Sequence, residues 1–277
     1  MTTIIECTLL DFDVEKGEWD GVAKPVTCRR AISPSGLPFC DYSLNPYSGC
    51  EHGCVYCYAP RMMHRDPSEW RVVGVKTNIV ERLSRELPGI KGRLTVGTVT
   101  DPYQYAERRF LLTRRCLDVL SKSQMRVTIL TKSDLVTRDS TFIREMGADI
   151  HLGITTIDDR ISKMTEPGAP LPSRRLAAIR TLVGEGVDVK VNIAPVMSTI
   201  SGHETELAEA IADTGVGKAY VDGLNLRFTD TERLDRMGIA TDDESVALVL
   251  DGLRERGVKT ELFKEFVELY SIKNDLQ

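Results

Sequence analysis

The segment Asn45-Pro-Tyr-Ser-Gly-Cys50-Glu-His-Gly-Cys54-Val-Tyr-Cys57-Tyr-Ala-Pro60 contains three of the seven cysteines of the chain, in the spacing C-x3-C-x2-C. Three neighbouring thiols cannot all pair with one another as disulfides, so the spacing favours a metal site. A structural zinc site normally has four protein ligands, whereas a [4Fe–4S] cluster held by three cysteines keeps one iron open to an outside molecule. A zinc site with His52 or His64 as fourth ligand is the alternative.

The same spacing, with the aromatic residue Tyr56 before the last cysteine, resembles the radical S-adenosylmethionine (radical SAM) superfamily. The resemblance implies that Cys50, Cys54 and Cys57 hold a [4Fe–4S] cluster and that S-adenosylmethionine (SAM) binds the open iron. It also implies that an electron from the cluster cleaves SAM to a 5′-deoxyadenosyl radical, with flavodoxin or ferredoxin as the electron donor.

Composition and charge narrow the class of protein. Of the 277 residues, 42% are hydrophobic and 28% are charged, which is typical of a globular protein. No apolar run approaches the roughly 18 residues of a membrane span, and the N-terminus lacks the pattern of a secretory signal, so we expect a cytoplasmic protein. The net charge of −5 disfavours nucleic acid as the main partner, although a local basic groove stays possible.

A repeated strand–helix pattern follows the cysteine segment. Strands are predicted at 39–47, 94–99, 126–131, 150–156, 187–193 and 219–226, and helices at 77–87, 109–121, 139–146, 174–185 and 203–213. Such alternation implies parallel strands joined by helical crossovers. We therefore expect an α/β fold, a partial (β/α)6 TIM-type barrel, as the resemblance also implies; a complete eight-unit barrel is the alternative.

The expected organisation has three parts. Residues 1–39 form an irregular N-terminal arm, and residues 40–230 form the partial barrel with the cluster loop at 50–57. Within the barrel, 61–70 is an exposed connection and 158–172 is a long loop. Residues 231–277 form a helical extension packed on the barrel, with helices at 241–256 and 262–270.

Polar residues collect where the predicted strands end, and the carboxyl ends of parallel strands are where ligands bind in such folds. Hydroxyl, amide and single charged groups there suit a polar cofactor. The candidate cofactor-binding residues are Tyr56, Thr98, Thr100, Asp101, Lys132, Thr155, Thr156 and Asn192.

Three further stretches resemble the spore photoproduct lyase-like branch of the superfamily: Thr100-Asp-Pro-Tyr-Gln-Tyr-Ala-Glu107, Thr131-Lys-Ser with Arg138-Asp139, and Glu166-Pro-Gly-Ala-Pro170 with Arg174. The resemblance implies that the end of strand two meets the amino group of SAM. It places Lys132, Thr155 and Thr156 at the ribose or carboxylate of SAM, and Asn192 at its ribose.

The chain departs from the DNA-repairing members of that branch, in which a cysteine beyond the cluster returns a hydrogen atom to the thymine radical. Only Cys116 follows the cluster, and it lies on the apolar face of a predicted helix. Cys28 and Cys40 are likewise expected to be buried small hydrophobes, and Cys7 has no assigned role. Photoproduct repair is therefore disfavoured.

The leading hypothesis is a radical SAM enzyme, a lyase or transferase, that acts on a small-molecule or peptide-like substrate. The first alternative keeps the enzyme and makes its substrate a nucleic acid, as in lesion repair or base modification. The second is a non-enzymatic zinc or iron–sulfur binding module.

Overall fold

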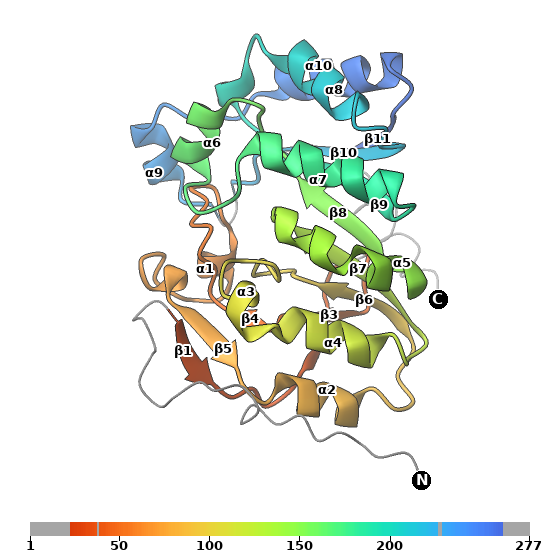
Figure 1. Cartoon of the computed structure of the whole chain (residues 1–277). Helices are drawn as coiled ribbons and strands as arrows, with labels where there is room; N and C mark the ends of the chain where they lie inside the picture. The colour runs from red at the N-terminus through yellow and green to blue at the C-terminus, as the bar shows by residue number, and fades with distance from the viewer. Residues whose placement is uncertain (1–22, 38, 227–228, 263–277) are drawn as a thin grey trace, which may run out of the picture.

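The computed structural model describes residues 23–262, apart from 38 and 227–228, and its main feature is an open eight-stranded sheet (Figure 1). The strand order is β11-β10-β9-β8-β7-β6-β3-β2. Parallel pairing joins β3 (Tyr42–Leu44), β6 (Gly92–Val96), β7 (Met125–Thr131), β8 (Asp149–Gly153), β9 (Asp188–Val196), β10 (Lys218–Gly223) and β11 (Lys259–Leu262). The edge strand β2 (Ile32–Pro34) pairs antiparallel with β3. The sheet is not closed, which agrees with the expected partial barrel.

Helices between successive strands cover the sheet, as the apolar periodicity predicts. They are α2 (Ile79–Glu86), α4 (Leu112–Leu120), α5 (Ser140–Glu145), α7 (Pro172–Gly184), α8 (Glu204–Ala212) and α10 (Asp243–Glu255). Figure 1 shows α4, α5 and α7 lying across the same face of the strands. Leu83 of α2, Leu117 of α4 and Ile179 of α7 are fully buried in the main hydrophobic core. Burying one such side chain contributes about 1.5–3 kcal/mol to folding.

A second, three-stranded sheet was not predicted, and it lies beside the cysteine segment. Its strands are β1 (Ala23–Val26), β5 (Val73–Lys76) and β4 (Tyr47–Ser48). The described part of the arm expected to be irregular thus contributes two short strands, β1 and β2. Because β4 leads directly into Cys50, this sheet fixes where the cysteine loop begins. The connection between the loop and β5, which includes α1 (Ala59–Met62) and η2 (Glu69–Arg71), is mostly exposed, as predicted.

Other elements also differ from the prediction. The segment 158–172 contains α6 (Asp159–Thr165), whose N-cap Asp158 accepts hydrogen bonds from the amides of Arg160 and Ile161 at 2.6 and 3.1 Å. Short helices α3 (Glu107–Phe110), η3 (Asp134–Asp139), η4 (Ser198–Ile200) and α9 (Thr231–Arg236) were not predicted either. The expected helix at 241–256 is α10. That at 262–270 begins on the last residue of β11, and its remainder lies outside the described residues, as do residues 1–22 with Cys7.

No helix in the described part of the chain is both long enough and apolar enough to cross a membrane.

Candidate active site

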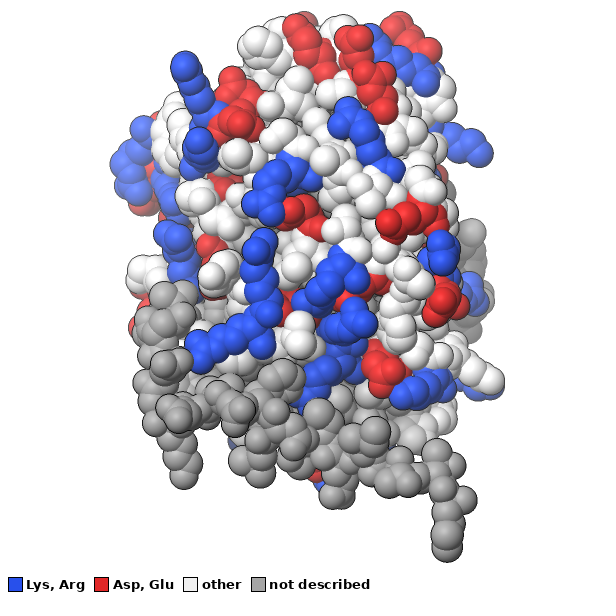
Figure 2. Space-filling model, in the orientation of Figure 1, with Lys and Arg blue, Asp and Glu red and all other residues white. Residues whose placement is uncertain are grey.

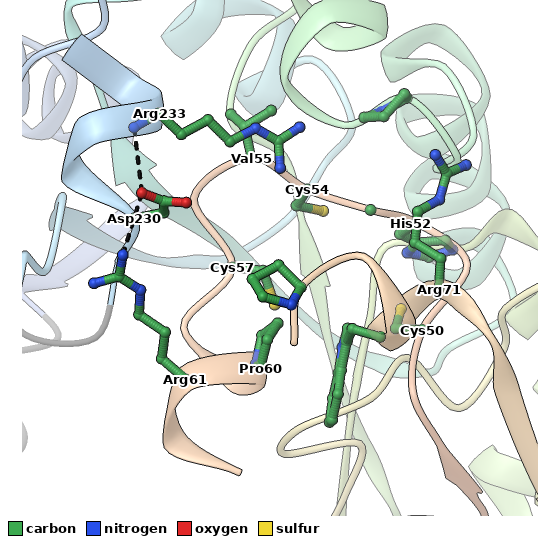
Figure 3. A pocket seen from close by; sticks show the side chains of 14 residues that line it. Cys50, His52, Cys54, Val55, Cys57, Pro60, Arg61, Arg71, Asp230 and Arg233 are labelled. Carbon is green, nitrogen blue, oxygen red and sulfur yellow. Dashed lines mark hydrogen bonds and ion pairs between the residues drawn. The ribbon is translucent and has the colours of Figure 1, made fainter. Parts of the chain in front are cut away.

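The three clustered cysteines line one pocket, which we call the thiol pocket (Figure 3). Cys50 is buried, and Cys54 and Cys57 are half-buried. Across the described residues, no three His, Cys, Asp or Glu side chains are placed to hold a single metal ion. Three thiols spread around a common space suit a cluster, because its iron atoms occupy separate positions.

Backbone contacts hold the cysteine loop in place from the side of α6. The amide of Val55 donates to the carbonyl of Thr165 at 2.8 Å, and that of Gly168 donates to the carbonyl of His52 at 2.8 Å. A Cβ atom on Gly168 would lie 2.1 Å from the Glu51 carbonyl oxygen, so the two segments touch directly. The Glu166-Pro-Gly stretch therefore supports the loop.

Hydrogen-bond donors predominate on the polar wall of the thiol pocket. Trp70 is buried, and its indole N–H has no acceptor among the described residues. Arg61, Arg71 and Arg233 also line the pocket, and Asp230, its one carboxylate, pairs with Arg61 at 3.2 Å. This lining fits a negatively charged occupant, such as a cluster bound by three thiolates.

Burial keeps the three cysteines protonated until a cation binds. It raises the pKa of the Cys54 thiol to about 12, and it also raises the pKa values of Cys50 and Cys57. A metal must displace these protons, so metal binding here is coupled to proton release.

Glu166 is the centre of a buried charged network beside the cysteine loop. Its carboxylate accepts hydrogen bonds from the hydroxyls of Tyr56 and, at 3.0 Å, Thr155. It pairs with Lys132 at 3.2 Å and with Arg175 at 2.5 Å. Burial alone would raise the pKa of Glu166, but the two cations outweigh it and lower that pKa to about 2. The carboxylate is therefore ionised at neutral pH and fixes the Lys132 ammonium, which also lies 5.5 Å from the centre of the Tyr56 ring.

Asp101 organises the neighbouring strand ends. Its carboxylate accepts from the backbone amides of Tyr103 at 2.8 Å and Lys132 at 2.7 Å, and from the Thr131 hydroxyl at 2.8 Å. His52 Nδ1 lies 3.5 Å from the same carboxylate, and burial lowers the pKa of His52. His52 therefore faces Asp101 as a neutral ring, while His64 lies in the exposed connection after the loop.

Two predicted residues keep unused polar atoms: Thr100 Oγ1 and Asn192 Oδ1 are buried and have no hydrogen-bond partner among the described residues. By contrast, Thr98 Oγ1 accepts from Asn45 at 3.1 Å, and Thr156 Oγ1 accepts from the Asp158 amide at 3.1 Å.

The positions predicted for three residues relative to the strands need correction. Thr155 and Thr156 follow β8, which ends at Gly153, instead of lying on the strand. Asn192 lies inside β9, which continues to Val196, and does not end it.

Arg175 was missed in the sequence. It is buried, pairs with Glu166 and donates to the carbonyls of Pro170 at 2.7 Å and Gly153 at 3.2 Å. Its neighbour Arg174, which belongs to one of the stretches that resemble the family branch, is exposed and pairs with Asp134. Glu166 itself was part of a noted motif but was not predicted as a site residue.

The remaining described cysteines lie away from the thiol pocket. Cys116 is fully buried in the main core, and Cys40 is buried. Cys28 is half-buried, with its thiol 3.4 Å from the Asn78 side-chain oxygen. The burial of Cys116 and Cys40 agrees with the packing role predicted for them, whereas Cys28 is only partly buried and packs against the edge of the main core.

Comparisons with known proteins identify the family. The model of the radical SAM superfamily matches residues 44–214. An uncharacterized protein of Mycobacterium tuberculosis is 35% identical over 236 residues, covering 77% of this chain and 68% of the relative. An uncharacterized protein of Methanocaldococcus jannaschii is 31% identical over 206 residues, which cover 73% of this chain and 77% of the relative.

Solved structures share the fold. Spore photoproduct lyase complexed with dinucleoside spore photoproduct gives a TM-score of 0.66 at 16% identity, covering 87% of this chain and 82% of that chain. Streptococcus suis SuiB bound to S-adenosylmethionine gives a TM-score of 0.55 at 15% identity, and the match covers 79% of this chain and 49% of that chain. With the family match, these likenesses lead to one conclusion: the chain belongs to the radical SAM superfamily, enzymes whose cofactors are a [4Fe–4S] cluster and SAM.

Proposed function

We propose that Cys50, Cys54 and Cys57 hold the [4Fe–4S] cluster and that the chain cleaves SAM reductively to act on a small-molecule or peptide-like substrate. The observation that carries this proposal is the meeting of three thiols in one donor-lined pocket beside the Glu166 network. When bound, the cluster supplies the electron for cleavage of SAM. A one-electron donor such as flavodoxin or ferredoxin then reduces the cluster again.

The residues beside the pocket have separable tasks toward SAM. Lys132 supplies a positive charge for the SAM carboxylate, and Glu166 holds its ammonium in place. Thr100 and Asn192 have buried oxygens that a hydrogen-bonding ligand would satisfy. Tyr56, Asp101 and Thr155 support this arrangement through their bonds to Glu166 and to the Lys132 backbone. Contacts of Thr98 and Thr156 with SAM stay a prediction.

A small substrate agrees with the wall of the thiol pocket, which includes the apolar residues Val55, Pro60, Pro67 and Trp70. Small-molecule sites are mostly apolar, with a few placed polar groups. Whether the reaction is that of a lyase or of a transferase depends on the substrate.

The test is anaerobic reconstitution with iron and sulfide, followed by dithionite and SAM without substrate. We expect brown protein that slowly forms 5′-deoxyadenosine and methionine. Cys54→Ala should abolish this cleavage, whereas Cys28→Ala, which removes a thiol outside the pocket, should retain it. Cleavage that survives in Cys54→Ala would overturn the ligand assignment.

Nucleic acid is a second candidate substrate class, and one surface feature favours it. Figure 2 shows basic side chains gathered on the face that carries α3 and α4. Arg108 and Arg114 are exposed there. Tyr105 is 71% exposed, and the guanidinium carbon of Arg108 lies 5.8 Å from the centre of its ring. Basic groups beside an exposed aromatic ring suit single strands.

Binding to nucleic acid would release counterions, so its affinity should fall steeply with salt. Because the chain is acidic overall, we expect no such binding to duplex DNA. Submicromolar, salt-sensitive affinity in a fluorescence titration would put the nucleic-acid substrate ahead of the small-molecule one.

A further inference from the structure

Arg71 and Arg233 line the thiol pocket but take no part in the tasks described above. The third arginine of the lining, Arg61, pairs with Asp230 at 3.2 Å. Neither the Arg71 nor the Arg233 guanidinium has a carboxylate partner within ion-pair distance among the described residues. The pocket therefore carries two more positive than negative charges, in a chain whose net charge is −5.

Arg71 is packed against the cysteine loop itself. Its Nε would lie 3.2 Å from a Cβ atom on Gly53, the residue between His52 and Cys54. Gly53 has a φ of +60°, which is unfavourable for residues with a side chain. Glycine at this position thus permits both the loop conformation and the close approach of the guanidinium.

Arg233 reaches the pocket from the other side. It belongs to α9, which follows the last strand of the predicted barrel, and it is half-buried. In Figure 3 the Arg71 and Arg233 guanidinium groups flank Cys54, and Arg61 turns away toward Asp230. Two arginines from distant parts of the chain thus line the same pocket from different sides of Cys54.

We propose that Arg71 and Arg233 are fixed counter-charges of the cluster held by the three cysteines, and that they raise its reduction potential. This inference rests on the ligand assignment under the proposed function. One-electron reduction adds negative charge to a site that already holds three thiolates. A nearby positive charge stabilises the reduced form more than the oxidised form, and net charge around an iron–sulfur cluster is a known determinant of its potential.

The two arginines should contribute unequally. Solvent and salt screen the exposed Arg71 more effectively than the half-buried Arg233. Arg233 should therefore have the larger effect on the potential, and the effect of Arg71 should shrink as ionic strength rises.

The test is a redox titration of the reconstituted full-length protein without SAM, with the reduced cluster quantified by electron paramagnetic resonance. Iron content is measured first, and a parent protein that holds no iron–sulfur cluster would refute the proposed function instead. For Arg233→Gln we expect the ratio of reduced to oxidised cluster at a given potential to fall about tenfold, a shift of 59 mV toward negative potential. Arg71→Gln should lower the reduction potential by less. Arg71→Lys and Arg233→Lys keep the positive charge, so each should retain most of the parent potential.

Two further variants complete the design. Asp230→Asn removes the one acid of the pocket and keeps a side chain able to cap α9, so the potential should rise. Arg180→Gln, at an exposed position of α7, is the control and should leave it unchanged.

Several outcomes would overturn the proposal. Equal potentials in the parent and the Gln variants would do so, and would leave the two arginines for an anionic group of the substrate. If the Lys variants have a reduction potential as low as that of the Gln variants, the shape of the arginine side chain, and not its charge, sets the potential of the cluster. If the Gln variants fail to hold iron, the reduction potential of Asp230→Asn becomes the test. An unchanged or lowered potential in that variant would refute the role of pocket charge in setting the potential.

Discussion

Replacing Glu166 with Gln tests the buried network that supports the proposed site. The change removes one negative charge and leaves Arg175, whose side chain is 1% exposed, and Lys132 without a counter-charge. Removing one partner of a buried ion pair typically costs about 3–5 kcal/mol. Arg175 keeps its bonds to two backbone carbonyls, and the partly exposed Lys132 can reach water. We therefore expect a loss near the lower end, about 3 kcal/mol in the free energy of unfolding.

The assay is urea denaturation of the cluster-free protein at pH 7 and 25 °C, followed by circular dichroism. Asp118→Asn is the matched control, because it makes the same chemical change in an exposed pair with Lys122, which should cost less than about 1 kcal/mol. A loss for Glu166→Gln no larger than that of the control would refute the reasoning.

The loss of stability in Glu166→Gln should also depend on pH. The folded-state pKa of Glu166, about 2, lies below its ordinary value of 4.5, so its ionised form stabilises the fold above about pH 4.5. That stabilisation is lost as the pH falls from 4.5 toward 2. The difference in stability between parent and Glu166→Gln should therefore be constant from pH 7 to 5.5 and shrink at pH 3.5. A difference that grows on acidification would contradict the assigned direction of the pKa shift.

Two further variants separate SAM binding from cluster binding. Lys132→Ala should leave iron content unchanged and weaken SAM binding about tenfold or more, since it removes one charge-assisted hydrogen bond; parent-like affinity in calorimetry would remove Lys132 from the cofactor site. Gly168→Ala should lower the iron content of reconstituted protein, because the added methyl would lie 2.1 Å from the Glu51 carbonyl oxygen and displace the cysteine loop. Gly184→Ala is its control, since nothing lies within 4 Å of the added methyl, and a Gly168→Ala protein that binds as much iron as this control would contradict the prediction.

Long elements with strong periodicity were predictable from sequence. The six expected strands all occur, in the expected order and parallel to one another, although β3 is shorter than the predicted 39–47. The five helices between them occur within a few residues of their predicted bounds. Apart from β3, which has only three residues, each has an apolar face or a β-branched run long enough to show its period within one element.

Short elements were missed because their pairing partners lie far away in the chain. β1, β4, β5 and β11 have two to four residues each, too few for a period to show. They exist because other strands pair with them, as β1 does with β5 about fifty residues later. Such pairing depends on the tertiary fold and leaves little trace in local sequence.

The sequence by itself indicated the radical SAM family and its cofactors, because the spacing of Cys50, Cys54 and Cys57 within one loop is a local property. It could not determine which of the adjacent Arg174 and Arg175 enters the site. Both lie in the first turns of α7, about 100° apart around the helix axis, and only the packing of that helix on the sheet turns Arg175 toward Glu166 and Arg174 toward solvent. Likewise Arg71 and Arg233, separated by most of the barrel in sequence, line the same pocket as Cys54 only because folding returns α9 to the cysteine loop.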